Sequence, residues 1–296
     1  MLVTLRRGKT SKLTHNLPKR PQQRFKATTT LDIQNKSVNN EEEIWKENWK
    51  RRCELATAYR GLAKYNMHEG VCNHLSVKTP SLHTKGERQL MLTAPYGIYW
   101  TEVTPRHLVG VDLETGELVE GKEPPEITAQ SIHMGIYAHA RKKEINCIMH
   151  THAMYTSILG TLQDPGIQMI HQTSTRFLNN VSYDQDFPLM ANQTSNQEGE
   201  RLGRVLGNKE VLMMGHHGLA TVGKSVAMAF DLHYYFEKAA EIQVKALQTG
   251  QPLKLLSTEI AIDTHAQMVD CQEFTAHAHF DALQKTLERE YPSFLA

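Results

Sequence analysis

Residues 147–152, with the sequence Cys-Ile-Met-His-Thr-His, join a strand-like run to two histidines that are one residue apart. A β-strand places His150 and His152 on the same face, whereas an α-helix would turn them about 200° apart. A helix-compatible run, residues 153–162, follows directly. Two imidazoles on one strand face can hold one cation, so this stretch predicts a strand that carries part of a metal site. The opposite face is then expected to carry the apolar residues Ile145, Cys147 and Met149.

The rest of such a site has to come from elsewhere in the chain, because a catalytic zinc-type centre uses three protein ligands and keeps one open position. The best candidate is a second histidine cluster, Gly215-His216-His217-Gly218, whose glycines allow the backbone to approach closely. The chain has 16 histidines, so a chance His-x-His pair is the alternative explanation of the first motif. The second cluster favours the metal site over that alternative.

Charge and composition restrict the partners of the chain. The 296 residues carry a formal charge of +1, but eight Lys and Arg residues precede the first acidic residue, Asp32. Without those eight, 25 basic residues stand against 32 acidic ones, a net charge of −7. A body of that sign argues against a nucleic-acid partner. No run of about eighteen or more apolar residues is present, which argues against a membrane-spanning helix.

The chain is expected to consist of three segments. Residues 1–40 are basic and poor in large apolar side chains, so we expect them to be disordered. Their composition fits a mitochondrial transit peptide and a plain basic tail equally well, which predicts a protein of the mitochondrial matrix or the cytoplasm. Residues 41–250 are expected to form the folded domain, and residues 251–296 a helical C-terminal tail. Four scattered cysteines without a CxxC pair predict neither a disulfide framework nor a cysteine zinc site.

Hydrophobic periodicity predicts the elements of the folded domain. One helix is expected to begin at the acidic residues 41–43 and to run to residue 63. The chain after Ser225, an expected N-cap, should be helical to near Gly250. Further helices are expected over 128–142 and 198–206, and strands at 74–78, 89–93, 108–113, 117–119, 169–171, 187–190 and, as a pair, 211–223.

The order of four motifs resembles the sequence plan of the class II aldolase/adducin family. The motifs are Asn73-His74-Leu75-Ser76, Ala94-Pro95-Tyr96-Gly97, His150-Thr151-His152 and His217-Gly218. The resemblance covers roughly residues 45–250, within the 41–250 domain, and looks most like the adducin head and its bacterial-type relatives. It implies an α/β fold, a three-layer α/β/α sandwich with a mainly antiparallel central sheet. It also implies a cyclic homotetramer with the metal near the subunit interface.

The resemblance also implies roles for individual residues. His150, His152 and His217 would hold a divalent cation, usually Zn²⁺ with Fe²⁺, Mn²⁺ and Co²⁺ as alternatives, which stabilises an enediolate. His216 would act beside them as a supporting hydrogen-bond donor. The small-molecule substrate is expected to contact Asn73, Ser76, Gly97 and Thr128. An asparagine at position 73 is equally well explained as a turn residue, so its binding role depends on the resemblance.

Several positions depart from the pattern of the family's aldolases. Ala129 stands where those enzymes have a glutamate that moves protons at the metal. Glu126 is the nearest candidate to act as acid/base instead, although its displacement along the helix start is on the order of one turn. A carboxylate from around Asp184 and Asp186, or from the tail, is the alternative. A phosphorylated substrate is not expected, because a serine pair and a tyrosine of the family are replaced by Ile127, Thr128 and Gln172.

These features predict a metal-dependent enzyme of lyase type, with aldolase, decarboxylase or epimerase chemistry on a small hydroxy-carbonyl or oxo-acid substrate. One alternative is a non-catalytic, adducin-like and actin-associated scaffold that retains a structural metal site. Another is a non-haem iron oxygenase, because three neutral ligands also suit Fe²⁺. Metal content, together with turnover of hydroxy-keto acids and sugar acids, would separate these three.

Overall fold

The computed structural model describes residues 30–142, 144–185 and 197–296, with side chains from Asn40 onward. The chain divides into two compact units, residues 1–38 and residues 39–296. Of the first unit, only the start of helix α1 (Thr30–Lys64) is described. Of residues 1–40, which were expected to be disordered, residues 1–29 fall outside the described part of the chain, whereas residues 30–40 are helical. The second unit carries all the other described elements.

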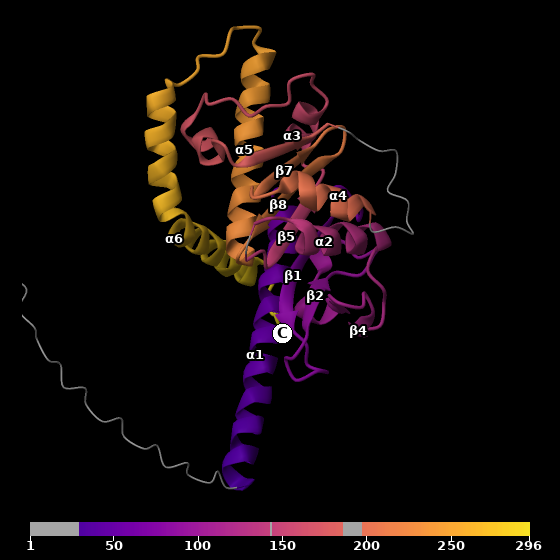
Figure 1. The fold of residues 1–296 in the computed structure, drawn as a ribbon. Helices are drawn as coiled ribbons and strands as arrows, with labels where there is room; N and C mark the ends of the chain where they lie inside the picture. Colours follow the sequence, from indigo (N-terminus) through magenta and orange to yellow (C-terminus); the bar gives the residue numbers. More distant parts are fainter. Residues whose placement is uncertain (1–29, 143, 186–196) are drawn as a thin grey trace, which may run out of the picture. The chain divides into compact units, whose positions relative to one another are not determined.

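The second unit is built on one sheet of eight strands in the order β4-β3-β2-β1-β5-β8-β7-β6 (Figure 1). Neighbouring strands are antiparallel throughout, except that β6 and β7 are parallel. The mainly antiparallel sheet predicted from the sequence is therefore confirmed. The strands are β1 (His74–Pro80), β2 (Gln89–Thr93), β3 (Val109–Asp112), β4 (Leu118–Glu120), β5 (Cys147–Thr151), β6 (Val181–Asp184), β7 (Val211–Met214) and β8 (Gly218–Gly223).

Helices cover both faces of the sheet, because the strands carry apolar side chains on both sides. In β7, Val211 and Met213 belong to a core with α3 (Met154–Gly160) and α5 (Val226–Gln248). Leu212 and Met214 belong to another core with α2 (Ile127–His139) and α4 (Gln197–Leu206). This strict alternation along one strand produces three layers, and the predicted α/β/α sandwich is confirmed.

The first and last helices complete the layer that contains α5. Apolar residues of α1, α5 and α6 (Thr258–Glu290) form one core together with residues of β1, β2 and β5. The side chain of Ser225 accepts a hydrogen bond from the Met228 amide at the start of α5, which confirms the predicted N-cap. The helical tail predicted for residues 251–296 is α6, and it lies in the same compact unit as the sheet.

Local differences from the predicted elements have physical reasons. Helix α1 begins at Thr30, eleven residues before Glu41, because no proline or glycine in residues 30–40 interrupts it. Ile145 packs with α2 and α4, not with Cys147 and Met149, because it lies before β5 begins. Residues 169–171 form no strand, and β6 is the strand that pairs with β7. The strand expected at 187–190 falls outside the described residues.

Helices α2 and α4 cross at a pair of glycines, which makes this contact sensitive to a single methyl group. A Cβ atom at Gly135 would lie 2.1 Å from the Gly199 carbonyl carbon, and one at Gly199 would lie 2.1 Å from the Ser131 carbonyl oxygen. Both neighbours are backbone atoms of packed helices. We expect Gly135→Ala to destabilise the protein by about 1–3 kcal/mol, although alanine is otherwise favoured over glycine in a helix by about 1 kcal/mol. Urea denaturation measures the difference, and a variant as stable as the parent would contradict the crossing.

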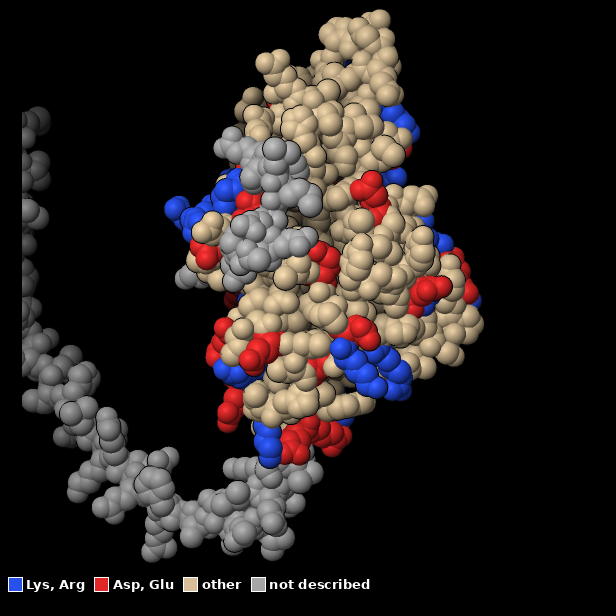
Figure 2. Space-filling view, turned by 90° about the vertical axis from the view of Figure 1, so that its right-hand side faces the viewer, with Lys and Arg blue, Asp and Glu red and all other residues tan. Residues whose placement is uncertain are grey.

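The surface of the described residues adds two observations. No described helix has both the length and the apolar character needed to cross a bilayer. On the face shown in Figure 2, acidic and basic side chains lie interspersed, and neither sign forms a continuous field. A protein that follows a phosphate backbone usually presents such a field, of positive sign.

Candidate metal centre

The three predicted ligands meet where the end of β5 lies beside the start of β8. His150 belongs to β5, and His152 follows the last residue of that strand. His217 immediately precedes β8, in the turn after β7. The register pairs Thr151 with Leu219 across the two antiparallel strands, so residues next to this pair come together. Strand pairing, and not sequence proximity, therefore assembles the cluster.

Gly218 is required by this close approach. A Cβ atom at position 218 would lie 2.4 Å from the Thr151 carbonyl oxygen and 3.0 Å from Cδ2 of His152. Any other residue would push the two ligand-bearing segments apart. This confirms the expectation that a glycine beside the second histidine cluster allows backbone contact.

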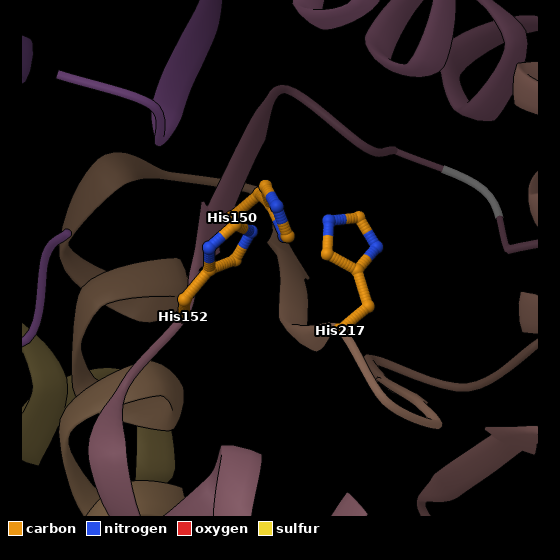
Figure 3. Close-up of side chains that lie close together, drawn as sticks. All are labelled: His150, His152 and His217. Carbon is orange, nitrogen blue, oxygen red and sulfur yellow. The ribbon is translucent and has the colours of Figure 1, made fainter. Parts of the chain in front are cut away.

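The rings of His150, His152 and His217 face one another (Figure 3). One nitrogen of each ring can be chosen so that all three lie within 4.8 Å of one another. The ring centroids are 5.1 Å apart for His150 and His152, and 4.8 Å for each of these with His217. His150 is buried, and the other two are half-buried. The cluster therefore has one buried histidine in the sheet and two that are partly exposed.

Hydrogen bonds at the far side of two rings set which nitrogen is available. Nδ1 of His150 lies 3.0 Å from the Leu219 carbonyl oxygen, which can only accept, so this nitrogen carries the proton. Nδ1 of His152 lies 2.5 Å from a carboxylate oxygen of Glu69 and donates in the same way. In both residues the lone pair is left on Nε2. Fixing the tautomer through the other nitrogen is a common feature of metal-binding histidines.

The donor set fits a divalent cation. Nε2 of His152 is buried and has no hydrogen-bond partner in the structure, which is unfavourable unless a ligand occupies the site. Burial holds the pKa of His150 well below its usual range, and burial together with His152 lowers the pKa of His217 to about 4. Neutral imidazoles are the form that binds metal. Three of them with no carboxylate suit Zn²⁺ or Fe²⁺.

Asn73 lies beside this cluster with its amide group oriented. Its Oδ1 atom accepts hydrogen bonds from the backbone N–H of Glu69 at 2.7 Å and of His152 at 3.3 Å. Its Nδ2 atom is buried and has no partner. The Nδ2 group can therefore donate a hydrogen bond to an oxygen atom of a ligand, while Oδ1 stabilises the local turn. The sequence had left both roles open for Asn73.

Behind His150 lies a buried hydrogen-bonded chain that sequence reasoning missed. His74 is the direct partner of His150 across β1 and β5, with ring centroids 4.7 Å apart. Nδ1 of His74 is 2.8 Å from Nε2 of His133, and Nδ1 of His133 is 2.6 Å from Oγ of Ser76. Ser76 is fully buried and also contacts the Tyr137 hydroxyl at 2.9 Å, so its hydroxyl bonds to His133 and Tyr137 in this structure. Its contact with a substrate stays a prediction. The sequence did contain one indication of this group, because His74 and Ser76 are two residues apart on a strand and therefore lie on the same face.

The donor and acceptor of each hydrogen bond in this buried group can be assigned from the Tyr137 hydroxyl. The Tyr137 hydroxyl donates to the Asn146 carbonyl, so Ser76 donates to Tyr137 and accepts from Nδ1 of His133. Nε2 of His133 then accepts from Nδ1 of His74. Burial lowers the pKa of His133 to about 3, in keeping with a neutral imidazole.

Glu126 has a different environment from the one expected of an acid/base at the metal. It is the N-cap of α2, and its two carboxylate oxygens accept from the Thr128 and Ala129 amides at 3.0 and 2.7 Å. The Thr128 hydroxyl donates to the same carboxylate. The structure therefore places Glu126 and Thr128 in one capping arrangement, with both carboxylate oxygens hydrogen-bonded to the start of the helix.

Of the remaining predicted site residues, His216 and Gly97 lie on turns and Asp184 is the last residue of β6. His216 is exposed, with a left-handed φ of +54°, in the turn that carries His217. Gly97 is exposed with φ +90° and open space around it. Asp184, considered as a carboxylate donor, is paired with the Arg201 guanidinium at 2.8 and 2.6 Å. Asp186 falls outside the described residues.

Comparison with known proteins places this site in a family. The model of the Class II Aldolase and Adducin N-terminal domain matches residues 53–244. The chain belongs to this family. Among its curated relatives is the "Putative aldolase class 2 protein" of Caulobacter vibrioides, 29% identical over 215 residues, with 73% of this chain and 79% of the relative covered. An adducin-related protein of Schizosaccharomyces pombe is 28% identical, with 76% of this chain and 67% of that protein covered.

A solved class II aldolase-type structure supports the same fold. The aldolase II superfamily protein from Pseudomonas syringae superposes with a TM-score of 0.72 at 27% sequence identity. The match covers 82% of this chain and 94% of that protein. The resemblance inferred from four short motifs is therefore confirmed at the level of the family and of the fold.

Proposed function

We propose that this class II aldolase-family protein is a metal-dependent enzyme of lyase type. Its substrate is a small hydroxy-carbonyl or oxo acid, cleaved, decarboxylated or epimerised at the carbon next to the carbonyl. The observation that carries the proposal is the convergence of His150, His152 and His217, whose ligand nitrogens lie within 4.8 Å of one another. Hydrogen bonds at Nδ1 of His150 and His152 leave the lone pair of each ring on Nε2, where it can bind a cation.

Zn²⁺ is the proposed cation, with Fe²⁺, Mn²⁺ and Co²⁺ as alternatives. A divalent cation held by three neutral imidazoles supplies a Lewis acid that polarises a substrate carbonyl. The chain's own residues would then orient the substrate. Asn73 is proposed to donate from its unpaired Nδ2 atom to a substrate oxygen, next to the backbone of His152.

Proton transfer is the least conventional part of the proposal, because Ala129 replaces the glutamate of the family's aldolases. Glu126 could act only after releasing its hydrogen bonds to the start of α2. His216, exposed beside His217, is the second candidate and requires no such release. Comparing kcat for Glu126→Gln and His216→Gln, each with its own stability measured, assigns the role.

A substrate panel tests the proposed function. We expect about one divalent metal per chain by elemental analysis, and turnover of non-phosphorylated hydroxy-keto acids or sugar acids that stops when the metal is chelated and returns when it is added back. Cleavage of L-fuculose 1-phosphate is expected to be negligible, because Ile127 and Thr128 replace the serine pair. Fast aldol cleavage of that phosphate would contradict the proposal and make the protein an ordinary sugar-phosphate aldolase.

An adducin-like scaffold is the second candidate, favoured by Ala129 in place of the acid and by similarity to an adducin-related protein. Stoichiometric metal without turnover of any panel member would support it. For either candidate we propose a homotetramer, measurable by analytical ultracentrifugation. The proposed compartment is the cytoplasm or the mitochondrial matrix, and the fate of residues 1–40 fused to a reporter distinguishes the two.

A further inference from the structure

A buried histidine of α5 holds β5 from the face opposite to the metal centre. Nε2 of His233 lies 2.7 Å from the Thr151 hydroxyl, and its Nδ1 lies 3.0 Å from the Thr221 hydroxyl on neighbouring β8. All three side chains are fully buried. Thr151 is the residue between His150 and His152, and its side chain points to the α5 face because side chains alternate along a strand.

The direction of every hydrogen bond in this group can be assigned. The Thr221 hydroxyl donates to the Ala229 carbonyl at 3.1 Å, so it accepts from Nδ1–H of His233. Nε2 of His233 is then an acceptor, and the Thr151 hydroxyl donates to it. Each donor has one acceptor, and the arrangement needs a neutral imidazole. Burial lowers the pKa of His233 to about 3, which keeps the imidazole neutral.

One turn further along the same helix, Glu237 holds the other side of the same segment. Its carboxylate accepts from the Tyr155 and Thr156 amides at 2.8 and 2.9 Å and from the Thr156 hydroxyl at 2.6 Å. These amides belong to the first turn of α3, where backbone N–H groups lack partners within the helix. Glu237 therefore fixes the start of α3 against α5.

His152 lies between these two attachments, at a position that the sheet itself does not hold. The strand pairing of β5 ends at Thr151, and α3 begins at Met154. Apart from the bond of its amide to Asn73, the backbone around His152 is held by Thr151 before it and by residues 155–156 after it. Residues four apart on a helix lie on one face, so His233 and Glu237 act from the same side.

We propose that His233 and Glu237 are positioning residues for the metal ligand His152, holding its backbone from the reverse face of the sheet through Thr151 and through the start of α3. This inference rests on the proposed function, since it assumes that His152 binds metal. A group that supports a ligand typically changes metal affinity by about 10- to 100-fold when it is removed.

Two substitutions of Thr151 separate positioning from packing. Thr151→Val keeps the methyl group and the strand preference but replaces the hydroxyl by a second methyl group, whereas Thr151→Ser keeps the hydroxyl and removes the methyl group. Zn²⁺ affinity is measured on the full chain by competition with a chromophoric chelator, alongside thermal unfolding of the metal-free protein. We expect Thr151→Val to weaken Zn²⁺ binding by about 10- to 100-fold, and Thr151→Ser to bind nearly as the parent does. The opposite ranking, or equal affinity for both variants, would overturn the inference.

Two further variants guard against a general loss of stability. Gln243, also buried on α5, bonds to Gln168 and Gly166, away from the histidines. Gln243→Leu is the matched control, expected to lower the unfolding temperature but not the Zn²⁺ affinity. If Thr151→Val does not fold, Glu237→Gln carries the test, because its amide can accept only part of the three bonds at α3. If the parent protein binds no Zn²⁺, the metal centre itself is refuted. If the parent binds Zn²⁺ and both Thr151→Val and Glu237→Gln bind it as tightly as the parent does, only the positioning role is refuted.

Discussion

His152→Ala is expected to abolish stoichiometric metal binding while the protein remains folded. The substitution removes an Nε2 atom that is buried and unpaired in the structure, so it removes a ligand without breaking a hydrogen bond of that atom. The affinity loss should exceed the about 100-fold that removal of a merely supporting group produces. Elemental analysis after dialysis, with circular dichroism as the test of folding, measures both outcomes.

His217→Ala is expected to behave in the same way, because His217 is also half-buried. His150→Ala should in addition lower stability, since His150 is 2% exposed and packs within the sheet. His277, an exposed histidine of α6, provides the matched control, and His277→Ala should retain full metal occupancy. Unchanged metal occupancy in His152→Ala or His217→Ala would reject the assignment of these ligands.

Metal-free protein is expected to lose several kcal/mol of stability between pH 7 and pH 5. Burial lowers the pKa of His133 and of His233 to about 3, well below the usual value near 6.5. Below pH 6.5 the unfolded chain binds protons that the folded chain does not, so the free energy of unfolding falls as pH falls. Each such histidine contributes up to about 1.4 kcal/mol per pH unit in this window, or about 4 kcal/mol for two at pH 5. That is a large part of the typical stability of about 5–15 kcal/mol.

Urea denaturation in the presence of a chelator, at pH 7, 6 and 5, measures this dependence. Burial raises the pKa of Glu237, which acts in the opposite direction, but one carboxyl group does not offset two buried histidines. His233→Gln should reduce the slope by about one histidine's share, about 1.4 kcal/mol per pH unit. A slope in the parent protein near zero over this range would contradict the neutral, buried state of these imidazoles.

The proximity of His150 and His152 could be predicted from the sequence because it depends on local geometry, whereas the approach of His217 depends on the pairing of β5 with β8. The period of two along a strand places His150 and His152 on one face whatever the rest of the fold is. Gly218 marks a close backbone approach, and the structure shows why, since a Cβ there would meet the Thr151 carbonyl oxygen at 2.4 Å. Ser225 was predictable as an N-cap for the same reason, because its hydroxyl bonds within one turn.

Glu126 shows where local reasoning reached its limit. Because Glu126 is only three residues from Ala129, it was the nearest candidate to replace the missing glutamate. In the structure its carboxylate accepts hydrogen bonds from the amides of the first turn of α2, as an N-cap does. The backbone geometry at the start of α2 places this carboxylate in an N-cap, and its role as acid/base stays a proposal. Ile145 is a smaller case, because its side depends on where the pleat of β5 begins.

By itself, the sequence predicted the family from the order of its motifs, and the three-layer class of fold through that resemblance. It also named the three histidines as candidate ligands. Only the tertiary structure decided what stands behind those histidines. His74 faces His150 through the register of β1 and β5, and His133 joins it from α2. His233 reaches Thr151 from α5, 82 residues away in the chain. Such contacts depend on strand register and helix packing, which arise from the simultaneous burial of many side chains and leave no mark at a fixed spacing in the sequence.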